Sequence, residues 1–442
     1  MTSSYPFISV EEIASSEKGA IAIGPFGSAM KSEIYVSDGV PVIRGTNIGS
    51  GQSISGDFVY ISEEDAARLK RSALRPGDIF FPHRGAIGQV GIMAPSWQQE
   101  PIMSSSLMRL RVDESVAVPE FVFWYFKSDQ GRHEILTYAS TVGTPGIGQP
   151  LTSLRSMRLP LPAIEIQREI ASILGALDDK IELNRRTSAN LEDMARSLYR
   201  SWFVDFDPVH AKMDGRQPAF MDEATAALFP HRFGQDGLPA GWKPGKLSDL
   251  IDFNPTERLS KGIEAPYLDM KTLPTSGMQH EPAIQRSFTS GTKFRNGDTL
   301  LARITPCLEN GKTALVQGLE GDAIGWGSTE FIVMRPAGHT ALAYPYCVAR
   351  SSDFRDEAIA SMTGSSGRQR ADAGRIKSIN AAIPSLEIMT EFSSITDPLI
   401  SKIAVLGSES QTLATLRDSL LPKLMSGEIR VGEAREHIEE VA

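Results

Sequence analysis

The sequence predicts an α+β protein in which two repeated α/β globules are joined by two long antiparallel helices, in a circular arrangement with a pseudo-two-fold axis. Three observations predict this fold class. An apolar stripe with helical spacing occurs twice, in the same register and without a gap. Short strand-like runs broken by Gly and Pro precede each stripe. Several of those runs resemble one another between the two halves of the chain.

The two stripes lie in residues 162–203 and 384–425, where Pro162 matches Pro384 and Leu198 matches Leu420. A helix with one apolar stripe must bury it, and a natural partner for a duplicated helix is its own copy. A two-fold axis makes such a pair antiparallel. In the alternative arrangement each helix packs on its own globule. The helix length of ~60 Å disfavours this alternative, because a single globule of this size needs a shorter helix. The side chains expected at the helix pair or at a partner interface are Ile173, Leu177, Leu191, Leu198, Trp202, Phe203, Ile395, Leu399, Leu413 and Leu420. The stripe also includes Met194.

Two prolines interrupt the second stripe, at Pro398 and Pro422. Asp397 can cap a helix that starts at Pro398, so we expect a short helix, a break or kink, and then a long helix. That long helix should end near Gly427, and the acidic residues after it should be frayed.

The globules are expected to share one fold but to present different loops. Four segments of the second half match segments of the first half in sequence pattern: 266–273 matches 41–48, 294–304 matches 74–84, 328–336 matches 104–112, and 364–370 matches 143–149. The expected order is a globule at 1–161, a long helix at 162–206, a linker at 207–240, a globule at 241–383, a second helix at 384–428 and a tail at 429–442. Phe206, Leu228 and Phe229 are candidates for packing the linker down. Such a repeat is typical of a protein that performs the same function on two different targets.

Composition indicates an ordinary globular protein, with 41% hydrophobic and 22% charged residues in 442. No apolar run reaches the ~18 residues of a membrane span, and the start of the chain is no signal peptide. The two cysteines lack metal-ligand spacing, so we expect a cytoplasmic protein without a metal site. The net charge of -9 does not exclude nucleic acid, because only a local basic surface is needed.

Sequence signatures of catalysis are missing. Asn254-Pro255-Thr256 and Asp207-Pro208-Val209 fail the Asn- or Asp-Pro-Pro-aromatic pattern of adenine methyltransferases at the third residue. There is no phosphate-binding GxxxxGK[ST]. Asp298 with Glu309 and Lys312 misses the spacing of a metal-dependent nuclease by one residue. We therefore expect a non-catalytic chain.

Polar loops between short strands are the remaining candidates for function. Arg reads guanine and Asn or Gln reads adenine in the major groove, while Ser, Thr and Gly-rich loops hold phosphates. Any single one of these residues is otherwise an ordinary solvated loop residue. The candidate DNA contacts are Arg44, Thr46, Asn47, Arg84, Ser105 and Thr144 in the first globule, and Lys271, Arg303, Thr305, Ser328, Thr329, Ser365, Ser366, Arg368, Gln369 and Arg370 in the second.

Six motifs together give a family resemblance over essentially the whole chain: LPLPAIEIQREIASIL at 159–174, SLYRSWFVDFDPV at 197–209, GLPAGWKPGKLSDL at 237–250, GSTEFIVMRP at 327–336, TGSSGRQR at 363–370 and LLPKLMSGEI at 420–429. The chain resembles the specificity subunit of type I restriction-modification systems. One departure is Met389, where the family usually has the Gln seen at Gln167.

The resemblance implies two target recognition domains, each reading one half of a split, asymmetric double-stranded DNA sequence. It implies that the helices set the spacing and dock two methyltransferase subunits, which flip out and methylate an adenine in each half-site. S-adenosylmethionine would be bound by those partners, and this chain would hold no cofactor. Motor-nuclease subunits would join to cleave unmodified DNA. The alternatives are a protein-binding coiled-coil scaffold and a DNA-modifying enzyme with unrecognised motifs. The target sequence and the spacer length do not follow from the sequence.

Overall fold

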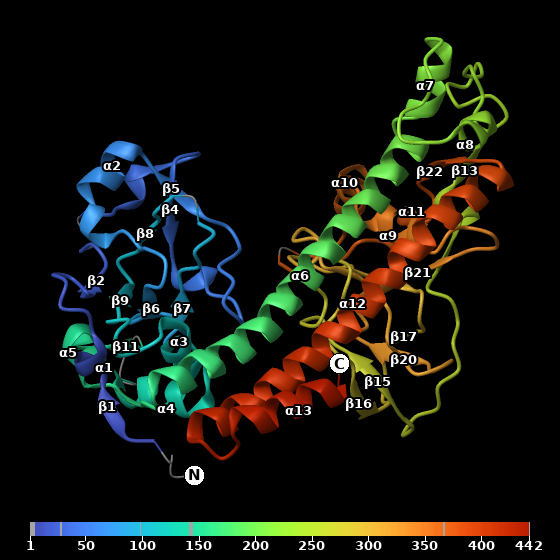
Figure 1. Ribbon diagram of the computed structural model, residues 1–442. Coiled ribbons are helices and arrows are strands. Elements are labelled where there is room, and N and C mark those ends of the chain that lie inside the picture. Colours follow the sequence, from blue (N-terminus) through green and yellow to red (C-terminus); the bar gives the residue numbers. More distant parts are fainter. Residues whose placement is uncertain (1–4, 27–28, 98, 141–144, 366, 442) are drawn as a thin grey trace. The chain divides into compact units, whose positions relative to one another are not determined.

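The computed structural model describes residues 5–26, 29–97, 99–140, 145–365 and 367–441. The chain divides into two compact units (Figure 1). Unit 1 comprises Met1–Leu183 and Ser410–Ala442, and unit 2 comprises Asn184–Glu409. Each unit therefore contains one globule and one half of each long helix. Thr144 and Ser366 lie outside the described residues.

Unit 1 contains two four-stranded sheets whose buried strands correspond to the short runs predicted from the sequence. The first, antiparallel sheet has the order β2 (Ile21–Ile23), β9 (Leu107–Leu110), β6 (Ile79–Pro82) and β7 (Gly91–Ile92). The second has the order β3 (Tyr35–Val36), β5 (Val59–Ile61), β4 (Val40–Ile43) and β8 (Ile102–Met103), with β4 and β8 parallel. Two small antiparallel pairs join β1 (Phe7–Ser9) to β12 (Arg158–Pro160) and β10 (Ala139–Ser140) to β11 (Gly146–Ile147).

The helices of this globule begin and end at residues suited to those positions. Pro119 occupies the first turn of α3 (Pro119–Lys127), where its missing N–H has no helical partner to lose. The Ser128 hydroxyl donates to the Tyr125 carbonyl and accepts from the Gly131 N–H, so it ends α3 and caps α4 (Asp129–Thr137). The other short helices are α1 (Val10–Ile13), α2 (Glu63–Arg68), α5 (Pro150–Ser156) and the 3₁₀ turns Ser32–Ile34, Gly45–Asn47 and Lys70–Ser72.

Unit 2 repeats this plan. Its antiparallel sheet has the order β14 (Ile251–Phe253), β21 (Phe331–Pro336), β18 (Thr299–Ala302) and β19 (Thr313–Leu315). The mixed sheet has the order β16 (Ile284–Ser287), β15 (Glu264–Leu268), β20 (Gly325–Gly327) and β17 (Thr292–Phe294), with β15 and β20 parallel. A further pair joins β13 (Lys243–Lys246) to β22 (Asn380–Ile383). The helices are α9 (Ala343–Arg350), α10 (Ser352–Ala360), α11 (Ala373–Ile376) and the 3₁₀ turn Leu247–Asp249.

A buried ion pair occurs at the same place in both globules. Asp78 is bound by the Nε and Nη2 atoms of Arg111, each at 2.8 Å. Asp298 is bound by the same two atoms of Arg335, at 2.6 and 2.7 Å. Both aspartates are fully buried, and each follows a glycine with positive φ, Gly77 or Gly297, in the turn before its strand. The predicted match of 74–84 with 294–304 and of 104–112 with 328–336 is therefore confirmed.

The predicted match of 143–149 with 364–370 is displaced by three residues. The Ile147 N–H donates to the His83 carbonyl, whereas the Ala371 N–H donates to the carbonyl of Arg303, the residue equivalent to His83. Arg370 therefore corresponds to Gly146 and not to residue 149. The sequence match aligned glycines, but main-chain pairing with the neighbouring strand sets the register.

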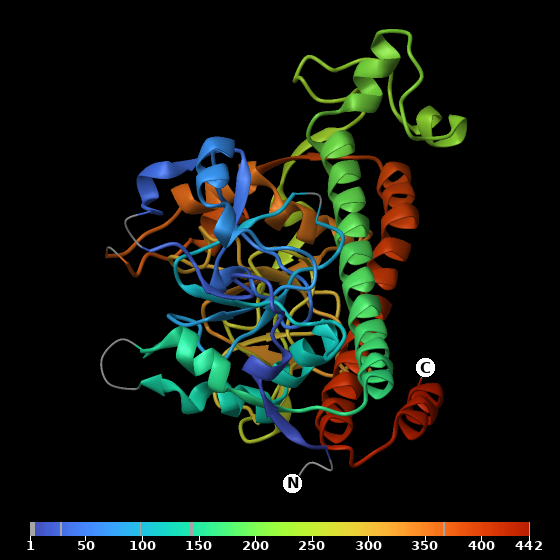
Figure 2. The ribbon, with the colours of Figure 1, turned by 60° about the vertical axis from the view of Figure 1, so that its left-hand side comes forward.

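The long helices are α6 (Ile164–Phe203) and α12 (Leu386–Ser426), which lie side by side in Figures 1 and 2. In unit 2 the Asn184 Nδ2 donates to the Glu409 Oε2 at 3.0 Å. The ring centroids of Phe203 and Phe392 lie 4.9 Å apart. As the residue number increases along α6, the number of the partner residue on α12 decreases, so the helices are antiparallel. In unit 1 the other halves are joined by an ion pair of 2.6 Å between Asp178 and Arg417.

The helices share a hydrophobic core with the globules rather than packing on each other alone. In unit 1 Ile173, Leu177 and Leu420 are buried and Leu413 is partly buried in a core that also holds α3. In unit 2 Trp202 and Phe203 are buried, and Leu191 and Leu198 pack at the edge of the globule core. Leu399 is half-buried. Ile395 is 37% exposed and Met194 is 57% exposed, so neither lies in a globule core, and the place of Ile395 at the helix pair or at a partner interface stays a prediction.

Of the predicted break or kink in the second helix, the break is wrong, because α12 continues through both Pro398 and Pro422. Pro398 is exposed, and so is Ser394, whose carbonyl loses its helical donor and faces the solvent side. Phe392, Thr396 and Ile400 are at most 1% exposed and hold the same turns against the globule. Tertiary packing here outweighs the local preference for a break.

The linker and the tail contain more structure than predicted. The linker forms α7 (Asp207–Met213) and α8 (Glu223–Leu228), and Phe229 is buried although Leu228 is 36% exposed. Phe206 is partly buried against the unit 2 core. After Gly427 the chain forms α13 (Val431–Val441) rather than a frayed end, because Val431, Ala434 and Ile438 share one face that packs on the unit 1 core.

Candidate nucleic-acid interface

In unit 2 three loops converge where β18 ends. The Arg303 N–H donates to the Glu330 carbonyl at 2.9 Å, and the Arg303 carbonyl accepts from the Ala371 N–H at 2.8 Å. The Thr305 N–H donates to the Gln369 carbonyl at 3.0 Å. We call this convergence loop cluster 2. It brings together eight of the predicted residues: Arg303, Thr305, Ser328, Thr329, Ser365, Arg368, Gln369 and Arg370.

The equivalent convergence in unit 1, loop cluster 1, lies where β6 ends. The His83 N–H donates to the Ser106 carbonyl at 2.9 Å, and Arg84 pairs with Gly146. The predicted residues Arg84 and Ser105 meet here. His83 takes the position of Arg303, but its Nε2 lies 3.0 Å from the Ser105 carbonyl and its ring is buried, which lowers its pKa. The exposed cation of this cluster is Arg84, one residue further along the chain.

The remaining predicted residues lie in the turns after β4 and β15. Thr46 and Lys271 are exposed. Asn47 is 1% exposed, its Oδ1 accepts from the Arg44 N–H, and its Nδ2 donates to the carbonyls of Ser55 and Asp57. The Arg44 guanidinium donates to the same Asp57 carbonyl. The prediction that Asn47 contacts a base is therefore wrong, because its amide atoms are used to shape the turn.

Arg370 is held by a carboxylate within loop cluster 2. Its Nε donates to both carboxylate oxygens of Glu330 at 2.9 Å, and its Nη2 donates to Oε1 at 2.7 Å. Glu330 raises the pKa of Arg370. The pair ties the loop of residues 363–370 to the start of β21, while Arg368 is exposed with no such pairing among the described contacts. Of the two guanidinium groups predicted to reach DNA from this loop, Arg368 is the more available.

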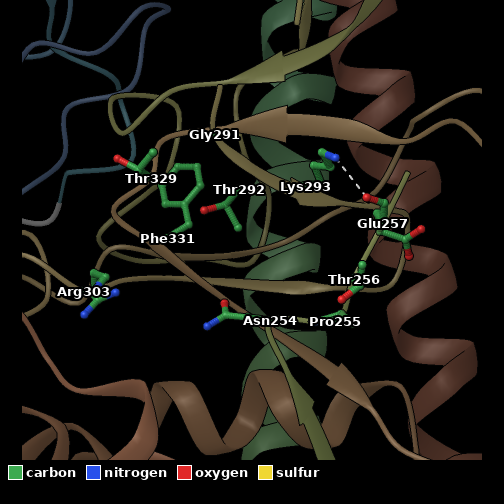
Figure 3. Close-up of a pocket in the computed structure, with 10 residues that line it drawn as sticks. All are labelled: Asn254, Pro255, Thr256, Glu257, Gly291, Thr292, Lys293, Arg303, Thr329 and Phe331. Carbon is green, nitrogen blue, oxygen red and sulfur yellow. Dashed lines mark hydrogen bonds between the residues drawn. The ribbon is translucent and has the colours of Figure 1, made fainter. Parts of the chain in front are cut away.

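A hollow of about 320 Å³ opens beside loop cluster 2 within unit 2 (Figure 3). It is lined by Asn254, Pro255, Thr256, Glu257, Gly291, Thr292, Lys293, Arg303, Thr329 and Phe331. The Arg303 Nε atom is buried and has no hydrogen-bond partner. Asn254 adopts a left-handed conformation, and its Oδ1 accepts from the Val333 N–H at 2.9 Å. That bond fixes the amide so that Nδ2 is the side-chain atom left to meet a ligand.

The charges around the hollow leave it with more donors than acceptors. The one carboxylate in its lining, Glu257, lies 2.7 Å from Arg335 and 3.9 Å from Arg295. Lys293 donates one of its three N–H groups to the Glu257 main-chain carbonyl at 3.0 Å. Arg303 and Lys293 are therefore the cations available to a ligand, beside the hydroxyls of Thr292 and Thr329.

Asn254, Thr292 and Lys293 were missed as site residues by the sequence reasoning. Asn254 drew attention only as part of a failed methyltransferase tetrapeptide, and Lys293 lies in a strand, β17, where the pattern favoured no function. The left-handed Asn before a Pro is the one signal in the sequence that could have marked this turn.

Neither a metal site nor a membrane span is found in the part of the chain that the structure describes. No three His, Cys, Asp or Glu side chains there are grouped so that they could hold a metal ion. None of the described helices is both long enough and apolar enough to cross a bilayer. Asp298, considered above as a nuclease carboxylate, instead forms the buried pair with Arg335.

Comparison with known proteins gives a consistent similarity. Residues 23–193 match the family model for the type I restriction modification DNA specificity domain. The whole chain is similar to type I restriction enzyme specificity subunits. It is 23% identical to the MjaIX specificity subunit of Methanocaldococcus jannaschii, with 85% of each chain covered. It is also 23% identical to the HindI specificity subunit of Haemophilus influenzae, covering 86% of this chain and 94% of the relative.

The fold is found in a solved member of the specificity-subunit family. The crystal structure of the S subunit from M. genitalium superposes with a TM-score of 0.53 at 16% identity, covering 96% of each chain. The resemblance predicted from the six sequence motifs is thus confirmed, and so is the fold class of mixed globules with two long helices.

Proposed function

We propose that this chain is the non-catalytic subunit that gives a type I restriction-modification complex its DNA sequence specificity. Each globule reads one half of a bipartite, asymmetric double-stranded target through its loop cluster. The helices α6 and α12 set the spacing of the half-sites and dock two methyltransferase subunits, which bind S-adenosylmethionine and methylate an adenine in each half. Motor-nuclease subunits join that complex to cleave unmodified DNA.

One observation carries the proposal: the scaffold of the globules is duplicated while the side chains at the loop clusters differ. The buried pairs Asp78–Arg111 and Asp298–Arg335 are the same in geometry. At the equivalent strand ends, however, unit 1 has a buried His83 bonded to the main chain and unit 2 has Arg303 beside a hollow. A common frame with different polar side chains suits the reading of two different sequences.

The test is a map of methylated adenines in cells that express this chain with its methyltransferase partner. The expected result is one asymmetric motif of two parts, separated by a spacer of fixed length and unspecified sequence, with an adenine methylated in each part. The purified chain alone should neither methylate DNA with S-adenosylmethionine nor cleave it with magnesium. Activity of the chain alone, or a single uninterrupted motif, would contradict the proposal.

A further inference from the structure

We infer that the hollow beside loop cluster 2 reads a guanine in the DNA half-site of the C-terminal globule, with Arg303 as the specificity-determining residue. This inference rests on the proposed function. It goes further by assigning one base identity to one site, and by giving the two globules different reading chemistry at equivalent positions.

The hydrogen-bonding groups of the hollow select the base. Arg303 offers N–H donors and no acceptor, and the Asn254 Oδ1 is occupied by the Val333 N–H so that Nδ2 is presented. Lys293 is not part of this set, because it lies on the other side of the hollow in Figure 3 and its Nζ donates to the Glu257 carbonyl. In the major groove guanine presents two acceptors, O6 and N7. Thymine presents only one acceptor, O4, beside its methyl group, adenine presents one acceptor and one donor, and cytosine presents a donor. A set of donors therefore fits guanine and opposes cytosine most strongly.

The surroundings of Arg303 favour a base over a phosphate. Its Nε atom is buried and unpaired, so the guanidinium is set into the wall of the hollow. The hollow also has apolar wall atoms from Pro255 and Phe331, which suit the edge of a planar base (Figure 3). In the view of Figure 3 the Asn254 amide and the Arg303 guanidinium lie on the side away from Lys293.

The comparison of the two globules supports the same choice. The position equivalent to Arg303 is His83, which is 3% exposed and bonded to the Ser105 carbonyl. A phosphate contact carries no direct sequence information, so it does not require different side chains in the two globules. A base contact must differ when the two half-sites differ. The change from a buried imidazole to an available guanidinium is therefore expected at a reading position.

The experiment compares methylated-adenine maps of the complex carrying the wild-type chain, Arg303→Lys, Arg303→Ala and Asn254→Asp. Arg303→Lys keeps the charge but loses the planar fork. Its use of non-guanine sites should rise at one position of one half-site, with discrimination there falling roughly tenfold or more. Arg303→Ala should relax the same position further. Asn254→Asp replaces a donor by an acceptor while keeping the bond to the Val333 N–H, so it should disfavour guanine at that position or its neighbour.

The controls separate a base contact from other effects. Arg216→Ala removes an arginine whose side chain is 65% exposed from the linker of the same unit and should leave the motif unchanged. Arg303→Ala should fold, because no side-chain hydrogen bond of Nε is lost, and equal yields of assembled complex verify it. An even fall of methylation with every motif position retained would mean a phosphate contact and would overturn the inference alone. A wild-type complex without a two-part motif would overturn the proposed function as well.

Discussion

Removing the carboxylate of Asp298 is expected to destabilise unit 2 and leave unit 1 intact. Asp298 is fully buried and accepts from Arg335 at 2.6 and 2.7 Å and from the Arg295 N–H at 2.9 Å. Breaking one partner of a buried pair costs ~3 to 5 kcal/mol, because the other charge is left uncompensated. Glu257 still lies 2.7 Å from Arg335, so Asp298→Ala should fall near the lower end of that range.

The matched substitution in unit 1 is Asp78→Ala, and it should cost more. Asp78 compensates two arginines, Arg111 at 2.8 Å and Arg109 at 3.9 Å. Arg109 is 4% exposed, and burial lowers its pKa, so loss of the nearby carboxylate leaves a poorly solvated cation. Glu17 forms an ion pair with Arg111 at 2.9 Å, and among the charges that act on Arg109 its effect is the smallest.

Hydrogen exchange followed by mass spectrometry separates the two effects, since it reports the stability of each peptide. Asp298→Ala should reduce protection in peptides from residues 294–336 and leave residues 75–112 unchanged, and Asp78→Ala should do the reverse. A loss below ~1 kcal/mol for Asp298→Ala would show that the pair is not a stabilising frame. Equal loss of protection in both units for either variant would refute the independence of the globules.

Three further outcomes are expected. Trp202→Ala should lower unfolding free energy by ~3 to 5 kcal/mol in a denaturant titration, because the side chain is 1% exposed, whereas Met194→Ala should be nearly neutral. Glu330→Gln should release Arg370 from its ion pair. The melting temperature should change little, because the Arg370 side chain is 44% exposed, and methylation should change only in the half-site of unit 2. Burial lowers the pKa of Lys127 to about 8 from 10.5, so between these pH values the unfolded chain binds more protons than the folded chain. The free energy of unfolding should therefore rise with pH across that window in the wild-type chain. In Lys127→Met this rise should be absent.

The long helices were predictable because their signal is repeated along many turns. Each apolar position of 162–203 is supported by its neighbours and by its match in 384–425. The predicted break at Pro398 was wrong because the helical preference of one residue does not reveal that the adjacent turns pack against the globule. Ile395 lies outside the part of the stripe that the globule covers for a related reason: helical spacing identifies a stripe, but the width of the covered part depends on the partner surface.

The site was predictable only in part, because residue type does not say which way a loop side chain points. Asn47 has the right chemistry for adenine, yet its amide is consumed by carbonyls of its own turn. Arg303 was among the predicted DNA contacts, and the structure places it in the lining of the hollow. Asn254 and Lys293 come from separate segments that only the folded sheets bring to one hollow.

Under the proposed function, the helix pair holds two independently reading globules at a fixed separation. The boundary between the compact units falls within residues 182–190 of α6 and 404–412 of α12. One heptad inserted in both segments keeps the apolar stripe near phase and lengthens each helix by ~10 Å. A map of methylated adenines for this variant should show both half-sites unchanged and the spacer longer by roughly one to three base pairs, since DNA twist and bending absorb part of the change. An unchanged spacer, or new half-site sequences, would contradict the claim.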